Sequence, residues 1–236
     1  KREYAYWLDQ SGNNNDWTSN NLTESDISVD SPTNNFATLN PLNNDSTLSE
    51  GNLKSTTGSD AWKIAFGTHL MESGKWYAEM LVADHDAGYT APAFGLATEV
   101  ANHTFGSIDG VTGMYAAAGN GGRYLDGTET ASHFTQSVNG DILQIAYDAD
   151  APKLWFGLNN TWIDSGNPAT GANSQSTNAN LATPSVFFTE MYGSGNIGVV
   201  NFGQDSSFAG YKTAQGNQDS NDIGDFYYTP PTGFLA

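Results

Sequence analysis

Apolar and polar side chains alternate along the chain at the two-residue period that is typical of β-strands. Between residues 76 and 82, every even-numbered position is apolar, whereas the odd-numbered positions are Tyr77, Glu79 and Leu81. Successive side chains of a strand point to opposite faces of its sheet. The pattern therefore predicts a strand with one wholly apolar face and one mixed face, on which Glu79 is expected to point outward.

The clearest local unit spans residues 140–163. Leu143, Ile145 and Tyr147 share one face of a first apolar run, and a second run begins after the turn-forming residues 149–152. In the second run, residues 154, 156 and 158 are again apolar on one face. Two alternating runs joined by a short turn indicate a β-hairpin.

Further short strands are expected at 93–97, 185–192 and 197–202, with a hairpin centred on the Gly-rich residues 119–122. Asn, Ser, Thr and Gly dominate the loops predicted between them, at 102–133, 164–182 and 209–224. Many short strands separated by turns favour an all-β fold, an antiparallel two-sheet β-sandwich with long polar loops. We assign residues 1–35, which lack a clear period, to a linker or a preceding domain, and residues 36–236 to the sandwich.

Composition supports this interpretation and narrows the partners. Trp, Tyr and Phe together make up 12% of the 236 residues, enough to build a core. Only 14% of residues are charged, but 26 acidic residues against 8 basic ones give a net charge of -18. Such a chain repels phosphate groups, so we expect neither nucleic-acid binding nor contact with an anionic membrane. There is no cysteine and no apolar run long enough to cross a membrane, which excludes thiol chemistry and predicts no membrane insertion.

An ordered series of motifs resembles the SPRY domain, a concanavalin-like jelly roll. The series comprises Ser73–Tyr77, Phe94–Ala97, Gly140–Asp148, Lys153–Phe156 and Val200–Gln204, and the resemblance spans roughly residues 36–204. The flanking segments Asp30–Pro41 and Asp225–Phe234 resemble those that precede and close SPRY-like domains of bacteriophage virion proteins. Eukaryotic SPRY domains bind peptides through loops at one end of the sandwich, but no peptide pocket aligns with the loops of this chain.

The resemblance implies a tail fibre or other surface component of a phage particle. It implies other virion proteins as partners, a homo-oligomer that is a trimer by analogy with fibres, and a glycan or protein of the host surface as the ligand. It implies no cofactor and no enzymatic activity. The alternatives are a purely structural capsid decoration or fibre spacer, a fibre-borne polysaccharide depolymerase, and a bacterial adhesin or surface filament.

Residues with catalytic or metal-binding chemistry form no recognisable motif. The four histidines have no metal-ligand spacing, although Asp84-His85-Asp86 is a possible acid–base or metal group. The segment Asp9–Asp16 is rich in oxygen ligands but lacks the alternating carboxylates of a calcium loop. Glu79 and Glu190 lie in predicted strands, where a structural role is favoured over a glycosidase pair. We therefore predict no catalytic residue and no metal site.

Aromatic side chains beside turns are the best candidates for a binding site. A tyrosine or tryptophan ring can stack on a sugar, while Asn and Arg supply hydrogen bonds. We predict a ligand-binding group formed by Tyr115, Asn120, Arg123, Tyr124 and Trp162, of which Tyr124 and Trp162 are expected to be exposed.

Overall fold

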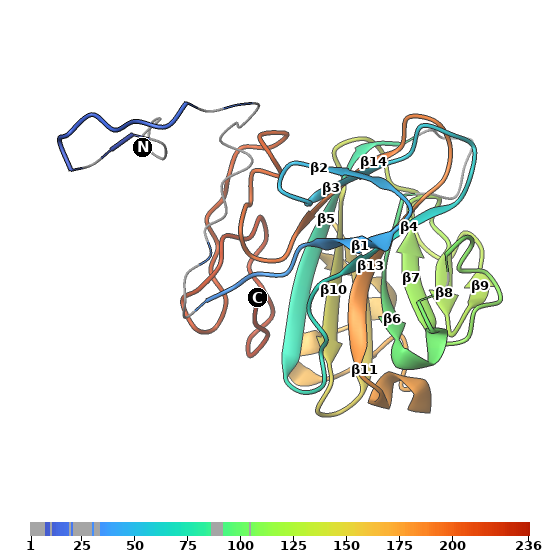
Figure 1. Ribbon diagram of the computed structural model, residues 1–236. Helices are drawn as coiled ribbons and strands as arrows, with labels where there is room; N and C mark the ends of the chain where they lie inside the picture. Colours follow the sequence, from blue (N-terminus) through green and yellow to red (C-terminus); the bar gives the residue numbers. More distant parts are fainter. Residues whose placement is uncertain are drawn as a thin grey trace.

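The computed structural model describes residues 8–9, 11–18, 20, 30, 34–85, 92–103 and 105–236. Two antiparallel seven-stranded sheets pack face to face (Figure 1). The first sheet has the order β1 (Leu39–Asn44), β4 (Lys63–Gly67), β13 (Ser185–Met191), β6 (Ala93–Thr98), β7 (Met114–Ala118), β8 (Arg123–Leu125) and β9 (Thr128–Thr130). The second has the order β12 (Thr161–Trp162), β11 (Lys153–Leu158), β10 (Ile142–Asp148), β5 (Lys75–Asp84), β14 (Ile197–Asn201), β3 (Lys54–Thr56) and β2 (Thr47–Ser49). The predicted β-sandwich is confirmed.

The strongest local prediction is confirmed in detail. Strands β10 and β11 form an antiparallel hairpin in which Leu143 lies opposite Leu158 and Asp148 opposite Lys153. The Asp148 carboxylate closes the turn, because its Oδ1 accepts hydrogen bonds from the amides of Asp150 (3.1 Å) and Ala151 (3.0 Å). On its other side β10 pairs with β5, so the hairpin lies inside the second sheet.

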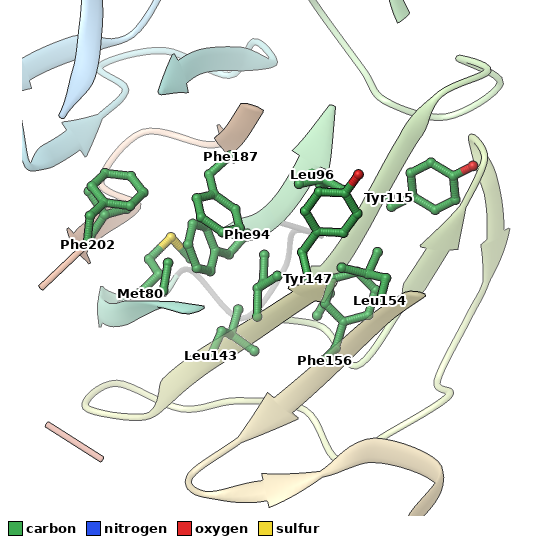
Figure 2. Packing of buried hydrophobic residues seen from close by; sticks show 14 of the residues in the cluster. Met80, Phe94, Leu96, Tyr115, Leu143, Tyr147, Leu154, Phe156, Phe187 and Phe202 are labelled. Carbon is green, nitrogen blue, oxygen red and sulfur yellow. The ribbon is translucent and has the colours of Figure 1, made fainter. Parts of the chain in front are cut away.

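The inner faces of the two sheets form the main core. Figure 2 shows Met80 and Leu143 of the second sheet facing Phe94 and Phe187 of the first. Burying an aromatic or a long aliphatic side chain contributes about 1.5–3 kcal/mol to stability. Alternation in β5 supplies this layer, since Trp76, Met80 and their even-numbered neighbours all point to it.

The outer faces of both sheets are also buried, which the alternation did not predict. Residues 202–236 cover the second sheet, and Phe208, Phe226 and Phe234 of this segment are fully buried. In Figure 1 the orange-to-red chain that carries them lies beside β5. The segment that includes the short 3-10 helix η2 (Glu99–Ala101) covers the first sheet, where Ile108 is buried. The sandwich therefore gains two further layers from segments without strands.

The C-terminal residues also extend the second sheet. Strand β14 ends with Asn201 opposite Glu79, which leaves the start of β5 unpaired on that side. Leu235 takes this place in a parallel bridge to Trp76, receiving a hydrogen bond from the Tyr77 amide (2.9 Å) and donating one to the Lys75 carbonyl (2.9 Å). An unpaired strand edge would otherwise expose backbone donors and acceptors, and Leu235 satisfies those at the start of β5.

Candidate functional site

Four of the five predicted binding residues lie on one hairpin. Tyr115 belongs to β7, Arg123 and Tyr124 belong to β8, and Asn120 lies in the turn that joins the two strands. The Asn120 side chain accepts a hydrogen bond from the Gly122 amide (2.8 Å) and so stabilises this turn. The predicted hairpin is confirmed, but these residues do not share one loop as expected.

The three predicted aromatic rings point in different directions. Tyr115 lies in the core between the sheets, and Tyr124 is packed on the outer face of the first sheet. Trp162 packs on the outer face of the second sheet, with its ring 6.4 Å from that of Tyr77. Since neighbouring strand residues face opposite ways, no common patch of these rings can form.

Exposure corrects the prediction for Tyr124. Its side chain is 4% exposed, because the segment containing Ile108 covers this part of the first sheet. Trp162 is half-buried against Phe226 and its neighbours instead of standing free. Packing therefore accounts for both rings.

Arg123 connects the two sheets at one lateral edge. Its guanidinium donates hydrogen bonds to Asp164 Oδ2 (2.8 Å) and to Gln175 Oε1 (2.9 Å). His133 Nε2 lies 2.9 Å from the same Asp164 oxygen. We call Arg123, His133, Asp164 and Gln175 the edge cluster. The edge cluster joins β8 of the first sheet to the chain that follows β12 in the second. No sequence motif predicts this contact.

The electrostatics of the edge cluster favour ionised Asp164. Partial burial alone would raise the pKa of this carboxyl, but the hydrogen bond and positive charge of His133 and the charge of Arg123 lower it below its usual value. The backbone is unusual here, because Asp164 (φ 54°) and Ser165 (φ 56°) are both left-handed. Such conformations cost energy in residues other than glycine and persist where the surroundings hold them.

A second anchor lies on the same hairpin at Asp126. Its Oδ1 accepts hydrogen bonds from the Gly113 amide (2.7 Å), from Tyr115 Oη (3.3 Å) and from Asn180 Nδ2 (2.9 Å), and its Oδ2 accepts one from Asn178 Nδ2 (3.1 Å). Although partial burial opposes it, these donors lower the pKa of the carboxyl. Asp126 thus holds the far end of the segment that begins at the edge cluster.

We call residues 163–182 the edge segment; the sequence predicts a long polar loop over 164–182 of it. The structure shows three short 3-10 helices there, η3 (Ile163–Ser165), η4 (Pro168–Thr170) and η5 (Ala179–Ala182). Backbone hydrogen bonds attach the segment to β11, from the Gln175 amide to the Leu154 carbonyl (2.7 Å) and from the Leu154 amide to the Ser176 carbonyl (3.3 Å). The Trp155 indole adds a bond to the Ala172 carbonyl (2.8 Å). The edge segment is therefore a fixed, mostly polar surface and not a free loop.

The two buried strand glutamates do not form a catalytic pair. Glu79 lies under the C-terminal segment on the outer face of the second sheet, whereas Glu190 lies on the outer face of the first. Packed sheets are about 10 Å apart, so these outward side chains are farther apart than the roughly 5–9.5 Å between glycosidase carboxyls. The expectation that Glu79 points into solvent is wrong, since it is completely buried.

Each buried glutamate has a raised pKa for the same main reason. Burial raises the pKa of Glu79 to about 7, although its carboxylate accepts hydrogen bonds from Tyr77, Asn201 and the amides of Tyr227 and Tyr228. Burial also raises the pKa of Glu190 to about 8, where one hydrogen bond from the Ile108 amide (2.9 Å) opposes it.

His85, His103 and Asp9 contact other parts of the protein. His85 Nδ1 lies 3.1 Å from the Ser137 carbonyl, and His103 stacks on Phe66. Asp9 accepts hydrogen bonds from the amides of Ser11 and Asn15. Asp86 lies outside the described residues. Within the described ranges, no three His, Asp or Glu side chains are grouped as metal ligands would be, and no helix is long and apolar enough to cross a membrane.

Comparisons with known proteins identify the fold. The SPRY domain of human HERC1 superimposes with a TM-score of 0.54 and 16% sequence identity, over 69% of this chain and 96% of that domain. No protein-family profile matches the sequence. No curated protein matches it either. The chain therefore has a SPRY-like β-sandwich fold.

Proposed function

We propose that this domain is a non-catalytic recognition module on the surface of a phage virion, and that the edge segment is its contact surface. The main support is the way the edge segment is held. Arg123 and Asp126 attach it to the first sheet and Leu154 attaches it to the second. A surface ordered in advance loses less conformational entropy when it binds, which favours affinity.

The side chains on the edge segment suit a hydroxyl-rich or amide-rich ligand. Asn167, Thr170, Asn173 and Thr177 are exposed and offer both donors and acceptors. The segment contains a single charged residue, Asp164, whose carboxylate already contacts Arg123 and His133. A glycan or a polar protein surface of the host fits this chemistry better than a charged polymer does.

The virion setting rests on the sequence resemblance of the two flanking segments. As part of this proposal, the domain assembles with other virion proteins as a homo-oligomer, a trimer by analogy with fibres. A rigid sandwich that carries variable polar segments is a common support for recognition. The buried glutamates belong to packed layers on opposite faces, which favours binding over hydrolysis.

Binding to whole cells tests the proposed surface. Fluorescently labelled protein is incubated with a panel of capsulated and non-capsulated bacteria, and the cell-associated fluorescence is measured. Ala169→Arg combined with Thr177→Arg places two long side chains on exposed positions of the edge segment. We expect this variant to lose at least about tenfold in affinity, because the new side chains block close contact.

Ser194→Arg is the matched control. Ser194 is exposed in the turn between β13 and β14, strands that lie away from the lateral edge in both sheets. The control is expected to bind as the wild type does. Equal binding of all three proteins would exclude the edge segment. Failure of the wild type on every strain would favour a purely structural virion protein.

A further inference from the structure

The six basic side chains of the described part of the chain fall into three groups. Three are neutralised by carboxylates, in the pairs Lys63–Asp45 (3.4 Å), Lys75–Asp148 (3.3 Å) and Arg123–Asp164 (2.8 Å). Lys153 donates to the Gly171 carbonyl (3.0 Å). Lys54 and Lys212 instead lie against tyrosines, with no carboxylate partner among the described residues. In a chain with a net charge of -18, two cations whose partners are neutral tyrosines are unexpected.

Both lysines belong to one surface, which we call the lysine–tyrosine patch and define as Lys54, Tyr211, Lys212 and Tyr227. Lys54 Nζ lies 3.0 Å from Tyr211 Oη and 5.5 Å from the centre of that ring. Lys212 Nζ lies 5.8 Å from the centre of the Tyr227 ring. Tyr211 is 46% exposed. An ammonium group has three donors, so hydrogen-bonding capacity remains for a ligand.

The fold spreads the patch over the outer face of the second sheet. Lys54 lies on β3, and Lys212 Nζ lies 3.5 Å from where a Cβ on Gly140 would be, just before β10. Strands β14 and β5 separate β3 from β10. Three strand spacings of about 4.8 Å separate the strand positions beneath the two lysines by roughly 14 Å. The patch is therefore long enough for a short extended chain and not for a single small ion.

The turn that presents the patch is fixed at a cost in backbone energy. Phe208 (φ 51°) and Ala209 (φ 56°) are consecutive left-handed residues, which is unusual for side chains other than glycine. Phe208 is fully buried against the sheet, and Asp205 accepts hydrogen bonds from the amides of Ser207 (2.8 Å) and Ala209 (2.7 Å). Backbone strain of this kind is retained where a precise arrangement of side chains matters.

Neighbouring carboxylates are already used by the protein. Asp205 holds its own turn, while Asp141 accepts hydrogen bonds from the Val138 amide (2.8 Å) and from Asn159 Nδ2 (2.7 Å). More distant acidic residues act weakly at physiological salt, where the screening length is about 8 Å. At this salt concentration, the attraction of an anion therefore depends on the charges close to the patch more than on the net charge of the whole chain.

We propose that the lysine–tyrosine patch binds an acidic polysaccharide, with a sugar ring stacked on Tyr211 and carboxylates paired with Lys54 and Lys212. This inference rests on the proposed recognition of host surfaces and assigns a ligand class to a second surface. An exposed aromatic ring beside an ammonium group matches the apolar face and the carboxylate of a uronic acid. A neutral glycan would use the ring but not the lysines.

The test is a titration of the purified domain with tetragalacturonate, followed by two-dimensional NMR of the backbone amides. We expect shifts at residues 211–212 and a dissociation constant in the millimolar range or below. Lys54→Met with Lys212→Met keeps the apolar stems, and we expect it to weaken binding by about tenfold or more for each lost charge pair. Lys63→Met removes a lysine of the first sheet that pairs with Asp45, and it should bind like the wild type.

Two further ligands test whether the patch recognises both the charges and the sugar rings of its ligand. The fully methyl-esterified tetrasaccharide has the same rings without charge, and tetraglutamate has the charge without sugar rings. Weaker binding of both supports the inference, whereas equal binding of either one overturns it. Failure to bind tetragalacturonate at millimolar concentration also overturns it. The cell-binding result for the edge-segment variant does not depend on the tetragalacturonate titration. Each proposal can therefore be refuted without the other.

Discussion

Replacing Glu190 by glutamine should reveal a large pH-dependent contribution to stability. Glu190 is 1% exposed on β13, and burial raises its pKa to about 8 from 4.5, with the negative charge of Asp109 adding to the effect. Among the described residues, its one hydrogen-bond donor is the Ile108 amide, which the oxygen of a glutamine side chain can also accept. Glu190→Gln therefore removes the charge and keeps the packing.

The direction of the pH dependence follows from comparing the pKa of Glu190 in the folded and unfolded states. Because the pKa is raised on folding, the native state holds a proton that the unfolded chain releases between pH 4.5 and about 8. This stability is fully present below pH 4.5 and is lost as the pH rises through about 8. One pKa unit corresponds to about 1.4 kcal/mol, so the raised pKa of Glu190 changes the free energy of unfolding by about 5 kcal/mol as an upper bound.

Urea unfolding of the wild type and of Glu190→Gln, measured below pH 4.5 and above about 8, tests this. The two proteins should have similar stability in acid. Above pH 8 the variant should be more stable by up to about 5 kcal/mol. Glu72→Gln, at an exposed position, is the control for a change in net charge and should show no such difference. A difference that does not change with pH would refute the account, as would a variant less stable than wild type at high pH.

Two further substitutions test how buried carboxylates hold the segments that cover the sandwich. Both carboxylate oxygens of Glu79 accept hydrogen bonds, whereas a glutamine side chain has only one oxygen that can accept them. We expect Glu79→Gln to lower the free energy of unfolding by about 1–3 kcal/mol and to speed amide hydrogen exchange at Tyr227 and Tyr228. Unchanged exchange at both amides would contradict this role. Asp126→Asn should free the end of the edge segment at Asn178 and Asn180. Because the pKa of Asp126 is lowered on folding, its stabilisation is present above pH 3.8 and lost as the pH falls through the folded value. In urea unfolding, the free energy of unfolding of Asp126→Asn should therefore differ most from that of the wild type at neutral pH. An equal difference in acid would exclude ionised Asp126 as the source of the stabilisation.

Alternation predicted the strands of the sandwich but not their surroundings. The β10–β11 hairpin and the inner core follow directly from apolar positions two residues apart. Glu79 was misplaced because an acid on a mixed face is usually exposed. Its neighbours Tyr77 and Leu81 are also buried, so that mixed face already contained the signal of a second covered surface.

The five residues of the predicted binding group do not form one exposed patch for a related reason. Tyr124 is flanked by turn residues, but it also lies in β8, and its pairing with Ala116 turns it to the covered outer face. Arg123 was chosen as a hydrogen-bond donor, whereas its partners Asp164 and Gln175 are 41 and 52 residues away in sequence. No local pattern encodes such a contact, because it depends on how the lateral edges of the two sheets meet. Whether any of the five residues binds a ligand stays a prediction.

The acidic excess of the chain has a structural use that its net charge conceals. Asp141, Asp148, Asp205 and Asp219 each accept at least one backbone N–H in a turn or a covering segment. A carboxylate accepts several hydrogen bonds at once and so suits irregular backbone, whose amides have no strand partner. Lysine and arginine cannot do this, since they are donors only. A sandwich that relies on long covering segments can thus become acidic without any cationic ligand or basic partner being involved. Lys54 and Lys212, which contact tyrosines and have no carboxylate partner among the described residues, are then the more informative charges, because turn formation does not require them.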